Sequence, residues 1–412
     1  MSCKKNKACR YCGSETLRMF VSLGDQPPSN SFLREDQVAT ERRYPLDVYW
    51  CERCFLVQLL DVVPAETIFD DYVYLSSSSK ALVQHYGRLA GAVTARFNLK
   101  AGDVVVDIGC NDGILLKGYT LPNLVRIGVE PSKVAETASA AGMTVFRGFF
   151  TVELAREIAA RHGRAKVVTA TNVFAHVDEI GSFADALLLL LAPDGVFIIE
   201  APYLIDMFEQ VLFDTIYHEH LCYLSLTPMV PFLAKHGLEV VDVERVPFGA
   251  SGPAIRVFVQ PYGGGRQRSS QVPQMLDHEA EWGVHRPARY REFESAVKKI
   301  RDAVLAILAR LMASGAQVGG YGAPAKGNTL LNYFGISSAT VPYIADTNTW
   351  KQGLLTPGSH IPIVSEEVFL QRMPDYALLL SWNYLDFFLQ HSDYIRKGGR
   401  FIVPMPSPRV VP

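Results

Sequence analysis

The feature that most constrains the fold is the stretch VVVDIGCNDG at residues 104–113. A run of β-branched residues that ends in an acid and then meets two glycines is typical of the first strand and first loop of a nucleotide-binding βαβ unit. The glycines let the backbone approach a ligand at the start of the next helix, where free N–H groups bind polar groups. A second strand ends in Glu130, about 20 residues further on, where a carboxylate can bind the two hydroxyls of a ribose.

The loop does not follow the pattern of dinucleotide-binding folds. Those folds use G-x-G-x-x-G, whereas this loop has only Gly109 and Gly113, with Asn111 between them. The pattern D-x-G-x-N-x-G, which starts at Asp107, is closer to the loop of methyltransferases that use S-adenosylmethionine (SAM), with Asn111 in place of their usual middle glycine. We therefore expect these four residues and Glu130 to bind SAM.

Composition narrows the class of protein. A chain of 412 residues, 49% hydrophobic and 20% charged, is expected to form two or three domains. A net charge of −2 gives no reason to expect binding to nucleic acid or to a membrane surface. The longest apolar run, residues 186–192, is too short to cross a bilayer, and no apolar run follows the basic start, so we expect neither a membrane span nor a signal peptide.

Four of the seven cysteines form two C-x-x-C pairs, Cys9 with Cys12 and Cys51 with Cys54. Each turn points two thiolates at one tetrahedral centre, and two turns complete a closed Cys₄ zinc site. A redox motif or unrelated thiols are the alternatives, which two pairs of matching spacing in one short segment disfavour. A closed site leaves no open position, so we predict a structural zinc in a reducing cytoplasm.

Two loops have roles that the sequence leaves open. Residues 27–32, PPSNSF, either cover a ligand or connect strands, and we interpret them as a connector. Tyr72 and Tyr74, with the serines at 76–79, either line the mouth of a substrate site or form the entry to a helix at residues 82–97, since serine is a preferred N-cap. The two tyrosines are therefore candidate substrate contacts.

After Glu130 helices and strands alternate as a doubly wound sheet requires. The expected strands are residues 144–146, 166–170 and 195–199. Ligands bind outside the carboxyl ends of the strands in such sheets, so Asn172 and Phe174 are expected at the cofactor and His176 at the reaction site. The alternative for His176 is to cap the helix that follows.

The segment YHEHLCY at residues 217–223 concentrates groups that can transfer protons. H-x-H with a carboxylate could bind a metal, but the helical H-E-x-x-H pattern and a third ligand are missing. A solvated polar turn is a second interpretation. We favour a third, acid–base catalysis, in which one histidine is the base, Glu219 orients it and a tyrosine stabilises an oxyanion.

A composition break at residues 263–270, GGGRQRSS, predicts a linker. Apolar residues at spacings of three and four from Phe293 to Leu311 then predict a long amphipathic helix that serves as packing surface. The predicted domains are residues 1–75, 76–265 and 266–412.

A second strand followed by a glycine loop, QVGGYGAPAKGN, occupies residues 317–328. Lys326, in a loop that opens a helix, suits a pyrophosphate by its charge and by the free N–H groups around it. Further candidate substrate contacts follow in this helix and after later strands: Asn328, Asp346, Trp382 and Asn383. A second doubly wound lobe is therefore predicted, with the substrate between the two lobes; the alternative is a purely structural lobe.

The order of these motifs, C-x-x-C … C-x-x-C, VVDIGCNDG, NVFAHVDE, YHEHLCYLSL and GYGAPAKGNTLLNYFG, resembles the SAM-dependent C-methyltransferases of nucleotide-linked deoxysugars, typically dTDP-4-keto sugars methylated at C3. The resemblance covers nearly the whole chain. It implies an α/β protein with a zinc-binding N-terminal domain, a SAM-binding Rossmann-like middle domain and a Rossmann-like C-terminal domain that helps hold the sugar nucleotide. It also implies that His220 is the base, with Tyr217, Glu219 and His176 around the sugar.

Enolate chemistry accounts for such a cluster. A 4-keto group makes the neighbouring C3 hydrogen acidic, a histidine can take that proton, and hydrogen-bond donors can hold the enolate oxygen. The enolate would then attack the SAM methyl in line, which depends on placing two bound ligands face to face. We expect a dTDP-linked 4-keto-deoxysugar of antibiotic biosynthesis as substrate, and a monomer or weak homo-oligomer.

Other functions remain open at this stage. The second glycine loop could accept NADPH, giving a bifunctional C-methyltransferase and 4-ketoreductase. O- or N-methylation of the sugar would not explain the histidine–glutamate–tyrosine cluster. From another class, a zinc-ribbon protein with this fold could bind or modify RNA, although the near-neutral charge opposes it. A non-catalytic scaffold would leave both ligand loops unexplained.

Overall fold

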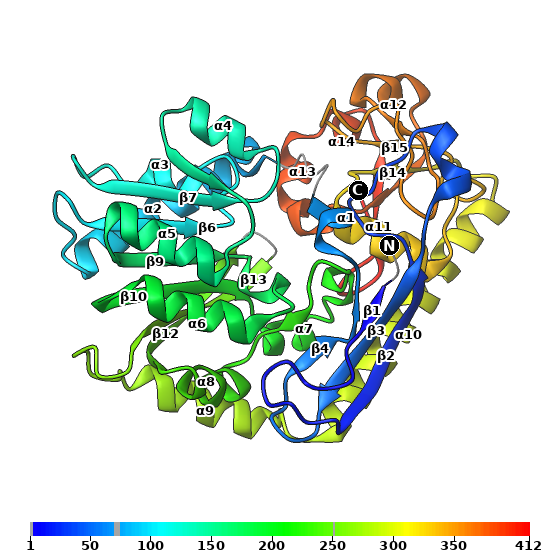
Figure 1. The fold of residues 1–412 in the computed structure, drawn as a ribbon. Coiled ribbons are helices and arrows are strands. Elements are labelled where there is room, and N and C mark those ends of the chain that lie inside the picture. The colour runs from blue at the N-terminus through cyan, green and yellow to red at the C-terminus, as the bar shows by residue number, and fades with distance from the viewer. Residues whose placement is uncertain (1–2, 70–74, 250–251) are drawn as a thin grey trace.

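The computed structural model describes residues 3–69, 75–249 and 252–412. These residues form sheets of two, four, six and seven strands. The seven-stranded and six-stranded sheets lie in two separate lobes, and the N-terminal strands run beside the long helix α10 (Pro287–Ala313) along the side that joins them (Figure 1). Both predicted doubly wound sheets are therefore present, in one mixed α/β chain.

The N-terminal residues form an antiparallel sheet. Its strands are β2 (Leu17–Gln26), β3 (Tyr44–Cys51) and β4 (Val57–Leu59), and the short β1 (Lys4–Lys5) pairs with β5 (Asp61–Val62) beside it. Burial alternates along most of β3, as expected for a sheet with one face on a core. The fourth strand comes from far along the chain, because β11 (Cys222–Tyr223) pairs with β4. The helices η1 (Glu35–Thr40) and α1 (Ala65–Phe69) complete this part.

The seven-stranded sheet has the order β12-β13-β10-β9-β6-β7-β8. Its parallel strands are β6 (Val104–Ile108), β7 (Val125–Glu130), β8 (Thr144–Arg147), β9 (Ala165–Thr171) and β10 (Leu191–Pro202). The hairpin β12 (Leu238–Gly249) and β13 (Gly252–Pro261) closes one edge with antiparallel pairing. The predicted strands lie within β8, β9 and β10.

Helices cover both faces of this sheet because its central strands are apolar on both sides. Val104 and Val106 of β6 share one core cluster with helices α5 and α6, whereas Val105 shares another with α2 and α3. The helices that follow the strands or precede them are η2 (Ser76–Ser78), α2 (Lys80–Arg96), α3 (Ile114–Gly118), α4 (Ala135–Ala140), α5 (Val152–His162), η3 (Phe174–His176) and α6 (Ile180–Leu190).

The segment between β10 and the C-terminal lobe is helical except for β11 and the closing hairpin. It contains α7 (Leu204–Glu209), η4 (Phe213–Thr215), α8 (Leu226–Lys235) and α9 (Gln271–Trp282). Helix α9 begins directly after the predicted linker and packs against α8 and β12, that is, against the seven-stranded sheet.

The C-terminal lobe contains the six-stranded sheet, in the order β16-β15-β14-β17-β18-β19. Its strands are β14 (Val318–Tyr321), β15 (Ile344–Ala345), β16 (Ile363–Val364), β17 (Tyr376–Leu379), β18 (Arg400–Val403) and the antiparallel β19 (Arg409–Val411). Its helices are α11 (Ala325–Phe334), α12 (Glu366–Arg372), η5 (Trp382–Tyr384), α13 (Leu385–His391) and α14 (Asp393–Arg396). Strand β14 is first in the chain and third in the sheet, so the chain reverses direction across the sheet beside it, where such folds bind ligands.

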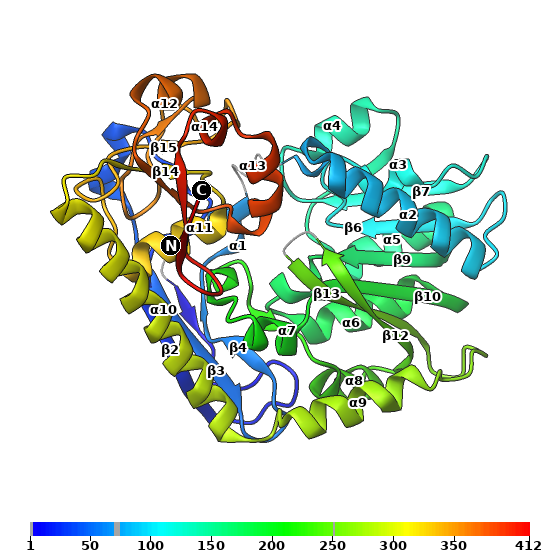
Figure 2. The ribbon, with the colours of Figure 1, turned by 180° about the vertical axis from the view of Figure 1, so that it is seen from behind.

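One core cluster joins the N-terminal sheet to the C-terminal lobe through α10. The buried residues of the predicted amphipathic stripe, among them Phe293, Val297 and Val304, share this cluster with β2, β3, α11 and β14. Figure 2 shows α10 running beside β2. The N-terminal strands therefore fold against the last lobe of the chain. Among the described residues, none of the helices combines the length and the apolar content needed to cross a bilayer.

Candidate functional site

The loop after β6 adopts the conformation that its glycines and asparagine allow. Gly109, Asn111 and Gly113 all have positive φ, of 68°, 51° and 78°. A Cβ on Gly109 would lie 2.3 Å from Cγ2 of Val173, so the loop after β9 packs directly on this glycine. Asparagine is one of the few residues with a side chain that adopts this conformation readily, which explains why Asn111 can replace the usual glycine.

The two predicted acids hold this loop in place. Oε2 of Glu130 accepts a hydrogen bond from the Asn111 N–H (3.0 Å), and Oε1 accepts from the Ser132 hydroxyl (2.6 Å). Asp107 is buried, and its Oδ1 accepts from the Thr169 hydroxyl (2.6 Å), which ties β6 to β9. Burial raises the pKa of Asp107 to about 7.

The serine-rich segment lies over the same loop. The Ser76 N–H donates to Oδ1 of Asn111 (2.9 Å) and the Ser77 N–H to Oδ2 of Asp112 (3.2 Å). Ser79 is the N-cap of α2, as the helix-entry interpretation requires. The predicted substrate contacts Tyr72 and Tyr74 lie outside the described residues.

The three candidate residues that follow β9, Asn172, Phe174 and His176, lie in two different environments. Asn172 and His176 line a small cavity, and the Asn172 side chain donates to the hydroxyl of Tyr86 (3.4 Å), a neighbour that the sequence did not identify. Phe174 is fully buried and packs against Phe183 and Phe197. Its ring therefore belongs to the core and we do not carry it forward as a cofactor contact.

The YHEHLCY segment places His220 at the same cavity. Nδ1 of His220 lies 2.7 Å from the Thr215 carbonyl oxygen. A carbonyl oxygen only accepts, so Nδ1 carries the proton and Nε2 is the basic nitrogen. The His220 ring lies 3.9 Å from that of Tyr217 and 5.0 Å from that of His176, measured between ring centroids. The predicted catalytic tyrosine and histidines are therefore brought together.

The group that orients His220 is not the one predicted. Glu219 was expected to do so, but its Oε1 accepts a hydrogen bond from the side chain of Asn30 (2.8 Å), and His220 is held by the backbone at Thr215 instead. Residues 217–220 form a turn, closed by the His220 N–H that donates to the Tyr217 carbonyl oxygen (2.9 Å), and the side chains of Glu219 and His220 leave this turn toward different partners. Neither Asn30 nor Thr215 was identified from the sequence, because a backbone carbonyl and a distant amide leave no motif.

His218 points away from His220. Its Nε2 lies 3.2 Å from the Tyr44 carbonyl oxygen and its ring packs edge-on against the Tyr44 ring in the N-terminal sheet. The metal interpretation of H-x-H is therefore not supported, and within the described ranges only the four cysteines group as metal ligands.

Burial controls the charge of the cluster. It lowers the pKa of His220 to about 4. It also lowers the pKa of His176, and the neighbouring His220 lowers that pKa further. It raises the pKa of Glu219 to about 7, against the opposing effect of the hydrogen bond from Asn30. Both histidines are thus neutral near pH 7, the state in which a base can accept a proton.

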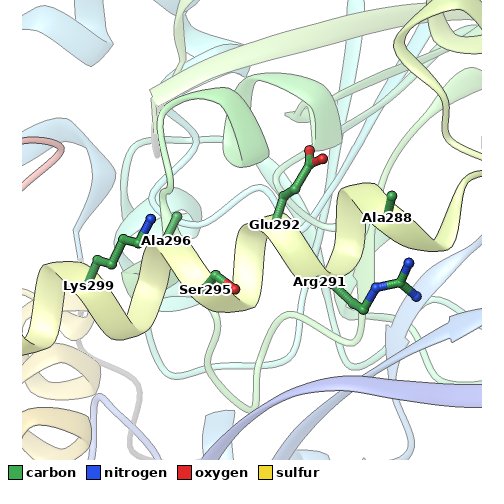
Figure 3. Close-up of a pocket in the computed structure, with 6 residues that line it drawn as sticks. All are labelled: Ala288, Arg291, Glu292, Ser295, Ala296 and Lys299. Carbon is green, nitrogen blue, oxygen red and sulfur yellow. The ribbon is translucent and has the colours of Figure 1, made fainter.

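The cavity lies at the carboxyl ends of the parallel strands. It holds about 20 Å³, room for about one water molecule, and its wall includes His220, Thr215, Tyr223 and Pro202. A more open hollow on α10, lined by Ala288, Arg291, Glu292, Ser295, Ala296 and Lys299, lies away from this cluster. Its Arg291 and Glu292 side chains point away from one another (Figure 3), so they do not converge on a ligand.

The four cysteines of the two C-x-x-C turns do converge. Their sulfur atoms all lie within 4.8 Å of one another, with 3.5 Å between Cys9 and Cys54 and 3.6 Å between Cys12 and Cys51. Tetrahedral zinc with Zn–S bonds of about 2.3 Å separates its sulfurs by about 3.8 Å, so four thiolates in this arrangement fit zinc. The turns pack on the lobe of the seven-stranded sheet through Tyr11, whose ring stacks on that of Phe232 in α8 (centroids 4.2 Å apart).

The second glycine loop brings Lys326 and Trp382 together. Nζ of Lys326 lies 5.3 Å from the Trp382 ring centroid, and the Trp382 indole N–H donates to Oδ2 of Asp214 (2.7 Å). Asp214 is fully buried, and its charge opposes the lowering of the Lys326 pKa that burial causes. Asp214 is a further residue that the sequence did not reveal, because it precedes the motif of residues 217–223 and contacts a residue far away in the chain.

The other predicted contacts in this lobe have different positions. Asp346 accepts the Ala323 N–H (2.7 Å) and so closes the glycine loop. Asn328 is buried and donates to the Ser29 carbonyl oxygen (2.7 Å), which ties α11 to the N-terminal residues. Asn383 is exposed on η5. Of the set, Lys326 and Trp382 remain best placed to contact a ligand.

Comparison with known proteins supports the three parts of the chain. Family models match as a zinc binding domain at residues 9–69, a methyltransferase domain at 83–243 and a C-methyltransferase C-terminal domain at 250–406. The C-methyltransferase NovU of Streptomyces niveus is 37% identical over 406 residues, which are 98% of this chain and 96% of that protein.

Solved structures match the chain in part. A SAM-dependent methyltransferase of Clostridium acetobutylicum is 14% identical, with a TM-score of 0.36, and covers 44% of this chain and 92% of its own. The magnesium protoporphyrin IX methyltransferase of Synechocystis, with SAH bound, is also 14% identical, with a TM-score of 0.34, and covers 46% of this chain and 89% of its own.

The cysteine cluster predicts how the protein responds to loss of zinc. We expect one zinc per chain, released by a chelator, and a lower unfolding temperature afterwards, because the metal holds the turns that pack on α8. Cys51→Ser should lose the zinc, whereas Cys3→Ser should keep it, since the Cys3 sulfur contacts backbone carbonyls outside the cluster. Colorimetric zinc assay with thermal unfolding measures both, and a full complement of zinc in Cys51→Ser would contradict the assignment.

Burial of His220 predicts acid sensitivity. Between its ordinary pKa of 6.5 and its lowered value of about 4, the unfolded chain binds a proton at this residue and the folded chain does not. The free energy of unfolding therefore falls as the pH drops from 6.5 to 4, by on the order of 3 kcal/mol from this residue alone. His220→Asn should lose this part of the pH dependence of the free energy of unfolding, and His236→Asn is the control. Equal pH slopes for His220→Asn and the wild type in urea unfolding would show that the residue is not held neutral.

Proposed function

Because the chain belongs to the SAM-dependent C-methyltransferases that carry an N-terminal zinc-binding domain, we propose that it methylates C3 of a dTDP-linked 4-keto-deoxysugar through an enolate. We further propose that this reaction serves deoxysugar biosynthesis for an antibiotic, in the cytoplasm. The observation that carries the proposal is the fixed tautomer of His220, which leaves a basic Nε2 in a buried cluster with Tyr217 and His176.

The first chemical step is removal of the C3 proton. Nε2 of His220 accepts this proton while the C–H electron pair forms the C3=C4 double bond and negative charge moves to the oxygen at C4. Neutral His220 can do this only if its second nitrogen stays protonated, which the Thr215 carbonyl oxygen ensures. The hydroxyl of Tyr217 is assigned to the enolate oxygen, where a donor lowers the barrier most.

The second step forms the carbon–carbon bond. SAM, when bound, would supply an electrophilic methyl group on a positively charged sulfur, and the S–CH₃ bond that breaks would leave neutral S-adenosylhomocysteine. The chain's part is to hold the sugar so that C3 lies in line with that methyl and to keep water out of the cluster. Burial of His220 and Glu219, which are exposed by only 7% and 4%, supports the exclusion of water from this cluster.

The cofactors have separate places. For SAM we assign the loop of Asp107, Gly109, Asn111 and Gly113 together with Glu130, with Asn172 beside it. For zinc we assign Cys9, Cys12, Cys51 and Cys54. The zinc ligands form a closed set, so the metal is structural and takes no part in the transfer.

The nucleotide part of the substrate is assigned to the C-terminal lobe. Lys326, at the start of α11, offers a positive charge to a diphosphate at a helix N-terminus, and Trp382 offers a flat apolar surface beside it. Asp214 lies behind both and is adjacent in sequence to Thr215, so the same short segment contacts the nucleotide lobe and the base. Tyr72, Tyr74 and Asn383 stay as predicted substrate contacts.

A combined ketoreductase is less well supported. Asp346 follows β15, next to the strand that carries the second glycine loop. An acid at this position suits a ribose 2′-hydroxyl and repels the 2′-phosphate of NADPH. Its Oδ2 is moreover engaged by the Ala323 N–H.

The proposal is tested by incubating the purified protein with SAM and a panel of dTDP-4-keto-deoxysugars in D₂O, with and without NADPH. Mass spectrometry and proton NMR follow the product and its C3 hydrogen. We expect one methyl group on carbon without NADPH. NADPH-dependent reduction without methyl transfer would move the chemistry to the ketone, and an unchanged panel would overturn the proposed substrate class.

Replacement of His220 tests the base. His220→Ala should lower methyl transfer by at least about 100-fold, the usual contribution of a general base, and should also stop exchange of the C3 proton with solvent. His236→Ala is the control, because His236 pairs with Asp185 on α6 outside the cluster. Exchange at the wild-type rate in His220→Ala would assign the base to another residue.

A further inference from the structure

The loop at residues 27–32, interpreted from the sequence as a connector, lies against the catalytic segment. It follows β2 and precedes η1, so it belongs to the N-terminal part of the chain. The Asn30 side chain donates from Nδ2 to Oε1 of Glu219, with 2.8 Å between the two atoms. The two residues are 189 positions apart in the sequence, and this contact joins the zinc-bearing part of the chain to the proposed catalytic cluster.

Glu219 depends on this contact for its surroundings. It is 4% exposed, and no ion pair to it forms within residues 3–69, 75–249 and 252–412. The ionisable neighbours on its own segment, His218 and His220, are engaged by the carbonyl oxygens of Tyr44 and Thr215. A buried carboxyl group without a donor is unfavourable, so the Asn30 amide both fixes its position and stabilises its ionised form.

The loop is itself held by the C-terminal lobe. The Ser29 carbonyl oxygen accepts from Asn328 in α11 (2.7 Å), and Leu33 exchanges two backbone hydrogen bonds with Leu355 (3.0 and 2.7 Å). Two further contacts extend this attachment, since the Phe32 ring meets Trp350 edge-on and Glu41 accepts from the Gly358 N–H (2.7 Å). Asn30 is thus placed by the lobe to which the sugar nucleotide is assigned.

We propose that Asn30 is a positioning residue for methyl transfer: its amide fixes the Glu219 carboxyl group and thereby the segment of residues 217–220 that carries the base. This inference rests on the proposed function and deepens it. The loop supplies a direct path from the C-terminal lobe to the cluster, through Asn328, Ser29, Asn30 and Glu219. The N-terminal domain then has a part in the active site in addition to binding zinc.

Loss of the Asn30 side chain should affect the reaction rate and not substrate binding. Asn30 contacts a protein carboxyl group, so its loss should lower kcat while KM for SAM and for the sugar nucleotide stays within about twofold. Hydrogen bonds to charged groups correspond to a fall of about 10- to 100-fold. The ionised form of Glu219 loses its donor, so its pKa should rise further above its already raised value, and the acid side of the pH–rate profile should move to higher pH.

Four variants test this. Asn30→Ala removes the amide, and Asn30→Asp keeps its shape but, in its ionised form, only accepts. Ser31→Ala is the matched control in the same loop, because the Ser31 contact that is observed uses its backbone N–H. The double variant Asn30→Asp with Glu219→Gln reverses donor and acceptor, so it should recover the unfolding temperature of the wild type without recovering kcat.

The expected pattern is a lower kcat in both single Asn30 variants, a wild-type kcat in Ser31→Ala, and the shifted pH profile. Asn30→Ala with kcat within twofold of the wild type would overturn the proposal. So would an equal loss in Ser31→Ala, or a kcat that falls only in proportion to the folded fraction.

A readout without substrate keeps this test separate from that of the reaction. Carbon-13 NMR of protein labelled at the glutamate carboxyl carbons, assigned by comparison with Glu219→Gln, reports the pKa of Glu219 directly. We expect it to be higher in Asn30→Ala than in the wild type and in Ser31→Ala. An unchanged pKa overturns the positioning role, whereas a shifted pKa in a protein that methylates none of the sugars overturns only the proposed function.

Discussion

The structure depends most on the pairing of β11 with β4. Cys222 and Tyr223 pair with Gln58 and Val57, and the Leu59 N–H donates to the Leu221 carbonyl oxygen (2.9 Å). These hydrogen bonds begin one residue after His220, so the position of this proposed base depends on a sheet that the N-terminal residues build. A two-residue strand has little stability of its own and needs a preformed edge to pair with. The order of the N-terminal sheet is therefore a condition for the order of residues 217–220, the proposed catalytic segment.

Packing on both sides of this sheet explains why it can serve as a support. The cysteine turns at one end stack on α8 through Tyr11 and Phe232, whereas the strands share a core cluster with α10 and the C-terminal lobe. Aromatic rings concentrate at that junction, where Trp50 stacks on Tyr290 and Phe208 stacks on Phe293. The N-terminal residues thus contact both of the other parts of the chain, although they come first in sequence.

The sequence was most informative where one local pattern determines the structure. The strand and glycine loop at residues 104–113, the amphipathic stripe of α10 and the cysteine pairs depend on neighbours in sequence, and they occur where the patterns predicted them. Contacts between distant segments were not predictable, as the amide of Asn30, the carbonyl of Thr215 and the carboxylate of Asp214 show. For Phe174 the local pattern was misleading. A residue at the carboxyl end of a strand can point into the core as readily as toward a ligand, and the Phe174 ring packs on Phe183 in the core.

The β11–β4 pairing also means that the linear map of this chain is not a map of separable modules. A fragment that ends near residue 69 would lack the strand that completes its sheet, and one that begins after it would expose β11 as an unpaired edge next to His220. Recombination between relatives at those boundaries would join halves of two different sheets. The unit that can be exchanged, inherited or engineered without loss of the β11–β4 pairing is the whole chain.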